Sequence, residues 1–351
     1  MKVVVTGASG NVGTSVLKAL GGDPAVERVV GIARRVPASH FPKVTWCRAD
    51  VSESDLVPIF RGADAVIHLA WLIQPSRDEA LTRRVNVEGS RRVFDAVARA
   101  GVPALVHASS VGAYAPGPRE RAVDESWPAT GIASSFYSRH KAQAESLLDG
   151  FEAEHPDVRA VRLRPALIFK AGAAAEIRRL FVGPLLPHWL VREQLLRLLP
   201  YPRGLRTQAV HSLDVGEAYR LAATLPVRGA FNIAADPVLD AGTIAQALGA
   251  RALELPVGSV RAAAWASWKL RLQPTSPGWL DMGMQSPLMS CDRARELLGW
   301  SPSVSSTQTV LELLAGLQRQ TGLPTPPLDP AAGGPLRVRE LLSGVGATDH
   351  V

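Results

Sequence analysis

Cysteine is scarce in this sequence of 351 residues, which contains only Cys47 and Cys291. Because the two lie far apart along the chain, they indicate neither a disulfide framework nor a metal site, and a reducing, cytoplasmic location is predicted. Basic runs with interleaved aromatics are missing too, although the formal net charge is +7. Nucleic-acid binding is therefore not expected, and the basic balance favours small anionic ligands.

Long apolar runs are also absent. The most apolar late stretches, residues 180–199 and 257–272, are interrupted by arginine, proline, His188 or Lys269, so we expect no membrane-spanning helix. The chain begins directly with an apolar strand, which leaves no room for a secretory signal. A hydrophobic content of 46% with 20% charged residues is ordinary for a globular protein, and we expect a folded, enzyme-sized body.

A glycine-rich turn follows the first predicted strand. The apolar stretch Lys2–Thr6 runs into the pattern Gly-x-x-Gly-x-x-Gly, which then opens a helix. This pattern predicts a dinucleotide-binding turn, in which glycines allow a sharp bend and a close backbone approach to a diphosphate at the helix start. An ordinary strand-to-helix turn fits the same spacing, whereas a Walker-type loop is excluded because no Lys-Ser or Lys-Thr follows. The predicted cofactor contacts here are Gly7, Gly10, Asn11, Val12 and Gly13.

The ends of the next two predicted strands bear on the choice of cofactor. The second strand ends in Arg34 and Arg35, where NAD enzymes commonly carry Asp or Glu for the ribose hydroxyls. Since a guanidinium can hold a 2′-phosphate, this pair favours NADP, unless both arginines are solvated turn residues. After the third strand, Asp50 and Val51 are predicted to contact the adenine, although Asp50 is equally suited to begin a turn.

The fourth and fifth predicted strands each carry a histidine inside an apolar run. His68 and His107 are therefore interpreted as hydrogen-bonded core residues rather than as the acid or base. Leu69 and Ala70, at the end of the fourth strand, are expected to lie along the cofactor near the nicotinamide ribose.

A serine pair and a Tyr-Lys pair carry the predicted chemistry. Ser109 and Ser110 follow the fifth strand, and Tyr137 and Lys141 stand four residues apart on one face of a predicted helix. An ammonium near the phenol favours the phenolate and lowers a pKa of about 10 toward the working range, while a serine hydroxyl polarises the substrate oxygen. The lysine can also hydrogen-bond the nicotinamide ribose. Hydride transfer at a carbon that bears oxygen needs such a proton partner.

The motifs occur in a characteristic order along the chain. They are Gly7-x-x-Gly10-x-x-Gly13, His68-Leu69-Ala70, Asn86-Val87-x-Gly89, Ser109-Ser110-x-x-x-Tyr114, Tyr137-x-x-x-Lys141, Arg162 to Phe169, His211 to Val215, Ala230 to Ile233 and Leu297 to Pro302. In this order they resemble the extended short-chain dehydrogenase/reductase superfamily, the group that includes NAD-dependent epimerases and dehydratases. The resemblance covers about residues 1–318.

The resemblance implies a fold and a set of roles. The fold is a doubly wound parallel α/β sheet of the Rossmann type with a smaller, mostly helical substrate lobe. Tyr137 is implied as the acid/base, Lys141 as its tuner and ribose ligand, and Ser110, rather than Ser109, as the hydroxyl that orients the substrate. Pro165 joins the cofactor contacts. Asn86 either positions the active-site helix or bonds within the helix bundle, and a homodimer through such a bundle is a further family expectation.

Departures from the family's pattern concern the substrate. Thr207 stands where enzymes of nucleotide-linked sugars often place a diphosphate-binding arginine, with Arg206 one position off, and no glycine follows Phe169 within two residues. Both departures weaken a sugar-nucleotide assignment without excluding it. Residues 170–205 are rich in large apolar side chains, which either pack on the core or on a subunit partner, or form an apolar pocket. The arginines of this stretch either bind an anion or lie on a solvated helix face.

Three parts are predicted along the chain. Residues 1–168 form the dinucleotide-binding domain, and residues 169–318 form the substrate lobe, from which a segment near 206–235 returns to the first domain. Residues 319–351 form a Pro/Gly-rich tail that we expect to be extended or poorly ordered. Late helices are predicted over 214–223 with Asp214 as cap, 241–248, 259–272, 305–317 and 338–342.

These observations predict an NADP-preferring oxidoreductase, with NAD as the alternative cofactor. It would transfer hydride between the nicotinamide and a carbonyl or secondary alcohol of a small molecule, through Ser110, Tyr137 and Lys141. A nucleotide-sugar epimerase or dehydratase with transient hydride transfer is the first alternative. A non-catalytic dinucleotide-sensing protein is the second, but a sensor needs no proton donor. The sequence sets neither the substrate nor the reaction direction.

Overall fold

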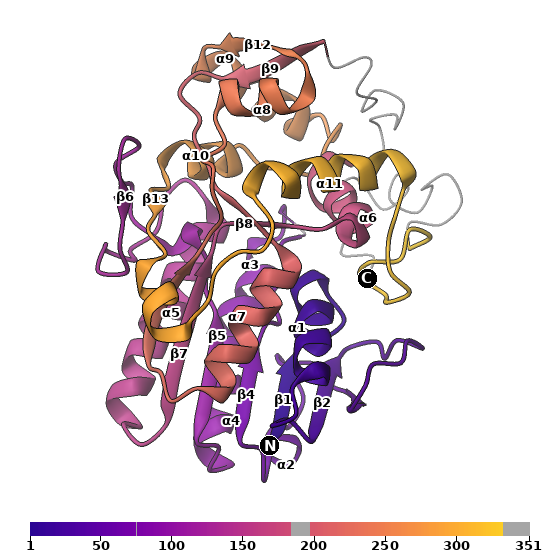
Figure 1. Ribbon diagram of the computed structural model, residues 1–351, viewed down its shortest axis with the longest axis vertical. Coiled ribbons are helices and arrows are strands. Elements are labelled where there is room, and N and C mark those ends of the chain that lie inside the picture. The colour runs from indigo at the N-terminus through magenta and orange to yellow at the C-terminus, as the bar shows by residue number, and fades with distance from the viewer. Residues whose placement is uncertain (75, 184–196, 333–351) are drawn as a thin grey trace.

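A seven-stranded parallel sheet forms the centre of the molecule (Figure 1), in a computed structural model that describes residues 1–74, 76–183 and 197–332. The strand order is β11-β7-β5-β4-β1-β2-β3, so the winding direction reverses between β1 and β4. This is the doubly wound sheet predicted from the sequence. Its strands are β1 (Lys2–Thr6), β2 (Arg28–Ala33), β3 (Val44–Arg48), β4 (Ala65–His68), β5 (Ala104–Ala108), β7 (Arg159–Pro165) and β11 (Gly229–Ile233).

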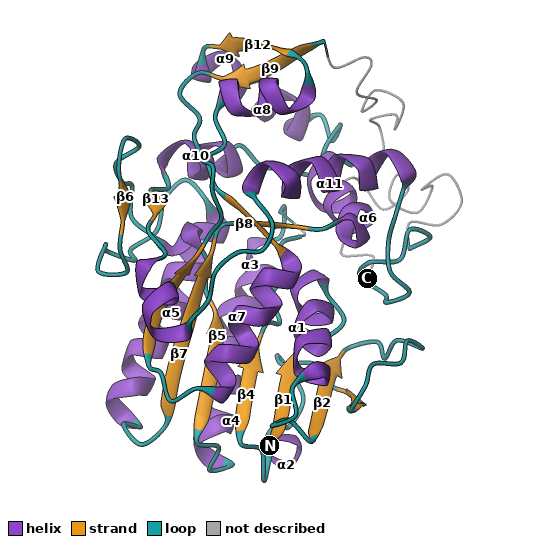
Figure 2. Ribbon diagram, viewed as in Figure 1, coloured by secondary structure: helices purple, strands orange, loops and turns teal. Residues whose placement is uncertain are grey.

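Helices cover both faces of this sheet, as Figure 2 shows. Val3 and Val5 of β1 belong to one buried apolar layer, and Val4 belongs to the other. Because successive side chains of a strand point to opposite faces, a strand buried on both faces reads as a continuous apolar run. The first layer is covered by α1 (Asn11–Gly22) and α7 (Ser212–Thr224), and the second by α2 (Val57–Phe60), α4 (Gly89–Arg99) and α5 (Phe136–Glu154).

The smaller lobe lies beyond the carboxyl ends of the strands, at the top of Figure 1. It contains short helices and three two-stranded parallel pairs, β8 with β10, β9 with β12, and β6 with β13. The remaining elements are α3 (Glu79–Arg83), η1 (Arg84–Glu88), η2 (Val111–Ala113), β6 (Ala122–Val123), β8 (Leu167–Phe169), η3 (Ala171–Ala173), α6 (Ala174–Ile177), η4 (Arg178–Val182), β9 (Leu198–Pro202), β10 (Ala209–His211), α8 (Ala241–Leu248), β12 (Arg251–Leu255), α9 (Val257–Lys269), α10 (Gly278–Gln285), β13 (Leu288–Met289), η7 (Ala294–Leu298) and α11 (Ser306–Arg319).

The segment that contains β10, α7 and β11 lies against the first half of the chain. Helix α7 packs on α1 with a close backbone approach, because a Cβ added at Gly216 would lie 2.7 Å from the carbonyl oxygen of Ser15. The hydroxyls of Ser15 and Ser212 hydrogen-bond at 2.8 Å across the same contact. Strand β11 then forms one edge of the main sheet.

The cap of α7 differs from the sequence-based expectation. Asp214 does not cap α7, because the helix begins at Ser212 and the His211 ring accepts the Leu213 N–H instead. The Asp214 carboxylate is buried and accepts hydrogen bonds from Ser303 Oγ and Val304 N. Its role is to hold the loop before α11, which the local helix pattern alone does not reveal.

The described part of the C-terminal segment is packed rather than extended. Thr325 is 1% exposed and donates to the Ser9 carbonyl at 2.8 Å, and Leu328 is fully buried. The helix predicted over 338–342, and the apolar and arginine residues of 184–196, lie outside the described residues. Among the described residues, no helix has both the length and the apolar character needed to cross a bilayer.

Candidate active site

A cavity of about 360 Å³ lies at the carboxyl ends of the strands, where β1 and β4 diverge. Open α/β sheets bind ligands at this switch point. The cavity brings together the glycine-rich turn, the start of α5 and residues from the second half of the chain. Its lining contains every predicted site residue: Gly7, Gly10, Asn11, Val12, Gly13, Arg34, Arg35, Asp50, Val51, Leu69, Ala70, Ser110, Tyr137, Lys141 and Pro165.

The glycine-rich turn needs its glycines for two close approaches. Gly7 has φ +68°, and a Cβ there would lie 2.7 Å from the Ala70 backbone nitrogen; a Cβ at Gly13 would overlap the Gly7 carbonyl oxygen. The turn leaves α1 without a side-chain N-cap, because Gly10 occupies the cap position. Uncapped backbone N–H groups at a helix start, facing a cavity, fit the diphosphate of a dinucleotide.

The end of the cavity where the adenosine was predicted is lined by Arg34, Arg35, Asp50 and Val51. Both arginines are exposed at the rim. The Asp50 carboxylate accepts from the backbone N–H of Ser52 at 2.8 Å and from its hydroxyl at 2.6 Å. Asp50 therefore both lines the cavity and begins a turn, so the two roles considered for it from the sequence are compatible.

Hydrogen bonds from neighbouring residues fix the start of α5. The Ser138 hydroxyl donates to the Gly112 carbonyl and accepts from the Ile132 N–H at 2.7 Å, which joins α5 to η2. The Ser110 hydroxyl accepts from the Gly112 N–H at 3.0 Å and lies near enough to the Tyr137 phenol to lower its pKa. Ser110 and Tyr137 thus line the same part of the cavity wall.

The electrostatics of Tyr137 differ from the sequence-based expectation. Burial raises the pKa of Tyr137 to about 12, and the Ser110 hydrogen bond only partly opposes this. The Tyr137 ring packs against Trp279 at 4.7 Å and Trp71 at 6.0 Å between ring centroids. Because the spacing of Tyr137 and Lys141 shows proximity but not burial, it predicted the opposite direction.

Lys141 lies between the sheet and an aromatic ring. Its Nζ donates to the Ala108 carbonyl at 2.6 Å and stands 3.4 Å from the centre of the Trp71 ring. Burial lowers the pKa of Lys141 to about 7, with the Glu145 charge opposing it. The group can therefore gain or lose a proton near neutral pH.

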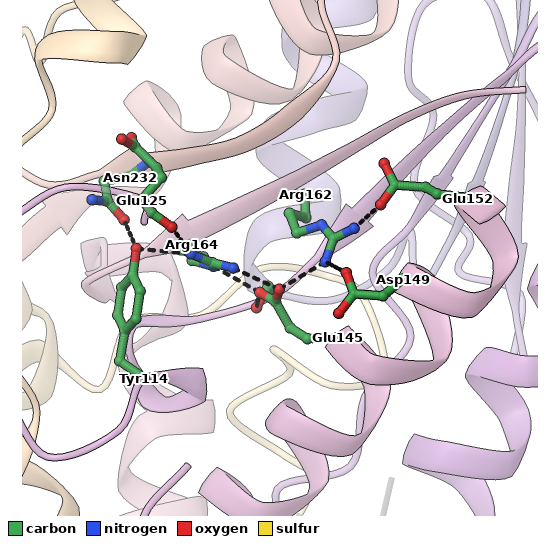
Figure 3. A network of polar contacts seen from close by, with 9 residues as sticks. Tyr114, Glu125, Glu145, Asp149, Glu152, Arg162, Arg164 and Asn232 are labelled. Atoms are coloured by element: carbon green, nitrogen blue, oxygen red, sulfur yellow. Dashed lines mark hydrogen bonds and ion pairs between the residues drawn. The ribbon is translucent and has the colours of Figure 1, made fainter. Parts of the chain in front are cut away.

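A buried ionic network between α5 and β7 was not predicted (Figure 3). Glu145 accepts two hydrogen bonds from Arg164, at 2.8 and 2.7 Å, and one from Arg162 at 3.0 Å. Arg164 also contacts the Tyr114 hydroxyl at 3.0 Å. Burial alone would raise the pKa of Glu145, but these arginines outweigh it and lower the pKa to about 2. The Ser109 hydroxyl donates to Glu145, so Ser109 belongs to this network rather than to the reacting groups.

Two further predicted residues have structural roles. The Asn86 side-chain amide accepts a hydrogen bond from the Leu72 N–H at 2.7 Å and donates one to the Leu72 carbonyl at 2.8 Å. These two bonds fix the loop that carries Trp71. His68 is hydrogen-bonded to Thr6 and Ser90, which confirms it as a core residue. His107 is buried too, but among the described residues its ring nitrogens have no hydrogen-bond partner.

Lys170 and the C-terminal segment were missed as neighbours of the glycine-rich turn. Lys170 is buried beneath α1, and its Nζ donates to the Asn11 carbonyl and the Thr14 hydroxyl, both at 2.7 Å. Pro326 and Pro327 line the cavity beside Thr325. The unusual Lys170 after Phe169 was visible in the sequence, but nothing local indicated that residues near 325 fold back.

The fold and this site together define an NAD-dependent enzyme of the dehydrogenase, epimerase and dehydratase class. The sequence model of the NAD dependent epimerase/dehydratase family matches residues 3–234. The chain belongs to this family.

Similar proteins cover most of the chain. An uncharacterized protein of Mycobacterium bovis is 26% identical over 93% of this chain and 86% of its own length. A 3-beta-hydroxysteroid dehydrogenase of Mycolicibacterium neoaurum is 28% identical over 53% of each chain. The structure of UDP-glucose 4-epimerase from Thermus thermophilus in complex with NAD superposes with a TM-score of 0.66 at 21% identity, over 91% of this chain and 99% of that one, and supports the fold.

Proposed function

We propose that this protein is an oxidoreductase that transfers hydride between a nicotinamide dinucleotide and a carbonyl or secondary alcohol, with net turnover of the cofactor. One observation carries the proposal: Ser110, Tyr137 and Lys141 line the same cavity as the glycine-rich turn. When bound, the nicotinamide supplies or accepts the hydride. The chain's own groups must orient the substrate and move one proton.

Each of the three polar groups has a distinct task in carbonyl reduction. Tyr137, whose raised pKa keeps it protonated at neutral pH, is the acid that gives its proton to the substrate oxygen. The Ser110 hydroxyl, fixed by the Gly112 N–H, holds that oxygen against the phenol. Lys141 binds the ribose hydroxyls and, when protonated, stabilises the phenolate that remains. Alcohol oxidation uses the same groups in reverse.

Arg34 and Arg35 support a preference for NADP. Both line the exposed rim of the cavity beyond β2, where a 2′-phosphate would be held through charge-assisted hydrogen bonds. The double variant Arg34→Ala/Arg35→Ala should lose about tenfold or more in NADPH affinity and little in NADH affinity, as measured by fluorescence titration. Tighter binding of NADH than of NADPH by the unaltered protein would overturn the preference.

The epimerase or dehydratase alternative retains the same residues but shows no net change in nicotinamide absorbance. Replacing Tyr137 by Phe tests the proposed chemistry, because it removes only the acidic hydroxyl. Turnover should fall by roughly 10²- to 10⁴-fold, while the affinity for NADPH stays within about twofold. Retained turnover would remove Tyr137 from the reaction. The homodimer and the cytoplasmic location stay predictions.

A further inference from the structure

The Tyr137 end of the cavity is walled by large apolar side chains. Trp279 stacks on Tyr137, and Phe181 meets Trp279 edge-on at 4.9 Å between ring centroids. Ile177, Leu180 and Met282 extend the wall beyond these rings. The surface next to the proposed acid is therefore aromatic and aliphatic, with few groups suited to hydroxyl-rich ligands.

Buried hydrogen bonds hold this wall in place. Gln74 is 5% exposed, and its Nε2 donates to the carbonyls of Leu180 and Pro274 at 2.8 and 3.3 Å. The Thr275 hydroxyl donates to the Phe181 carbonyl at 2.6 Å. The bonds to the Leu180 and Phe181 carbonyls anchor the backbone of η4. The apolar side chains of this segment are therefore presented to the cavity in a preformed arrangement.

The cationic groups of the cavity are poorly placed to hold a diphosphate here. Among the described lining residues the cations are Arg34, Arg35, Lys141 and Arg179. The two arginines of the pair lie at the adenosine end, and Lys141 is bonded to the sheet. Arg179 donates to the Pro327 carbonyl at 2.9 Å. Arg206, the neighbour of Thr207, donates to the Arg119 carbonyl and is not among the cavity lining.

We propose that the substrate is an apolar ketone or secondary alcohol with a cyclic or long hydrocarbon body and no phosphate. This inference rests on the proposed function. The oxygen of the substrate meets Ser110 and Tyr137, and its body lies against Trp279, Phe181 and Ile177. The wall then selects by desolvation, because it provides few partners for the many hydroxyls of a sugar.

The test compares two groups of probes with the full chain. Initial rates with NADP⁺ are measured for a 3β-hydroxysteroid and 2-decanol, and separately for UDP-glucose. Calorimetry measures equilibrium binding of the corresponding ketones and of UDP-glucose at several temperatures. We expect kcat/KM for at least one apolar alcohol to exceed that for UDP-glucose by about 100-fold, and its ketone to bind with a negative heat-capacity change.

Variants locate the binding surface. Ile177 is only partly buried and has no ring contact with Tyr137, so Ile177→Ser should raise KM for the apolar alcohol by about tenfold and leave kcat nearly unchanged. Trp279→Ala should raise KM further and also lower kcat, since its ring supports Tyr137. Trp265→Ala is the matched control, because Trp265 is 52% exposed on α9 and does not line the cavity.

The outcomes separate this inference from the function on which it rests. Turnover or tighter binding of UDP-glucose would overturn the apolar substrate and leave the Tyr137 chemistry standing. Binding of an apolar ketone that Ile177→Ser weakens, without any hydride transfer, would support the apolar site and overturn the oxidoreductase proposal. Failure of both apolar probes to bind, or equal effects of Ile177→Ser and Trp265→Ala, would overturn the apolar site.

Discussion

Two neighbouring positions on α5 (Phe136–Glu154) hold a buried charge in opposite ways. Lys141 has a backbone carbonyl and an aromatic ring as neighbours, and burial lowers its pKa to about 7. One turn later, Glu145 is equally buried but is held by two arginines, which lower its pKa to about 2. A desolvated charge without a counter-ion titrates near neutrality, whereas a paired one stays charged.

This difference suits Lys141 to a part in the reaction and Glu145 to a part in stability, although both lie on one helix. A group that can change its protonation state near pH 7 is useful beside a reacting oxygen. A carboxylate that stays ionised in a network with Arg162 and Arg164 serves instead to fix α5 against β7. Ser109 and Ser110 differ in the same way: the Ser109 hydroxyl donates to Glu145, whereas the Ser110 hydroxyl acts on the pKa of Tyr137.

The largest predicted effect is on stability, from Glu145→Gln. Losing the carboxylate leaves Arg164 buried with a weaker partner, and the free energy of unfolding at pH 7 should fall by about 3–5 kcal/mol. Denaturant unfolding measures this. Glu88→Gln is the control, since Glu88 forms surface pairs with Arg83 and Arg91 and its loss should cost at most about 1 kcal/mol. Equal losses in the two variants would contradict the assigned role of the network.

The pH dependence of the Glu145 effect follows from the direction of its pKa shift. The pKa of Glu145 in the folded protein is about 2, below the ordinary value of 4.5 for a glutamate. The stabilisation is therefore present above pH 4.5 and is lost as the pH falls toward 2. The difference in unfolding free energy between the unaltered protein and Glu145→Gln should narrow through this window. A difference that is constant between pH 7 and pH 3 would contradict the paired state of Glu145.

Unlike Glu145→Gln, which should lower stability, Lys141→Met should lower turnover and raise stability. Turnover should fall by about 100-fold, because the ribose ligand and the charge beside Tyr137 are lost. Stability at pH 6 should rise by ~1–3 kcal/mol, since a desolvated charge is removed. The pKa of Lys141 in the folded protein, about 7, lies below the ordinary value of 10.5 for a lysine. The cost of burying the charge is therefore complete below pH 7 and declines as the pH rises toward 10.5. Activity assays and unfolding at pH 6 and 9 measure both effects; a less stable variant at pH 6 would contradict this account.

The sequence predicted the parts of this site that depend on local spacing. The turn from Gly7 to Gly13, the Tyr137 and Lys141 pair and the serines each lie within one strand end or one helix turn, where spacing determines proximity. The partners of Glu145 lie on β7, and Trp71 and Trp279 meet Tyr137 from distant segments. Such contacts depend on tertiary packing, which also decides burial and therefore the direction of the Tyr137 shift.

The neighbouring serines offer a finer comparison. Ser109→Ala removes a donor to Glu145 and should lower the free energy of unfolding by about 1 kcal/mol, with turnover almost unchanged. Ser110→Ala should lower turnover by about tenfold or more and leave stability within about 1 kcal/mol, because its hydroxyl faces the cavity. Parallel measurements of unfolding and turnover for both variants test these separate roles. A loss of turnover in Ser109→Ala would contradict them.

The smallest effect is a fraction of a proton taken up when the cofactor binds. With a pKa of about 7, Lys141 is mostly neutral at pH 8, and a nearby dinucleotide with its phosphates should favour the ammonium. Calorimetry in two buffers of different ionisation enthalpy should therefore show uptake at pH 8 and none at pH 6, where Lys141 is already protonated. Lys170, whose pKa burial lowers to about 8, also lies beneath the glycine-rich turn. The Lys141→Met variant separates the two lysines: uptake at pH 8 should largely vanish, and if it persists unchanged, the proton belongs to Lys170 and the contrast between Lys141 and Glu145 fails.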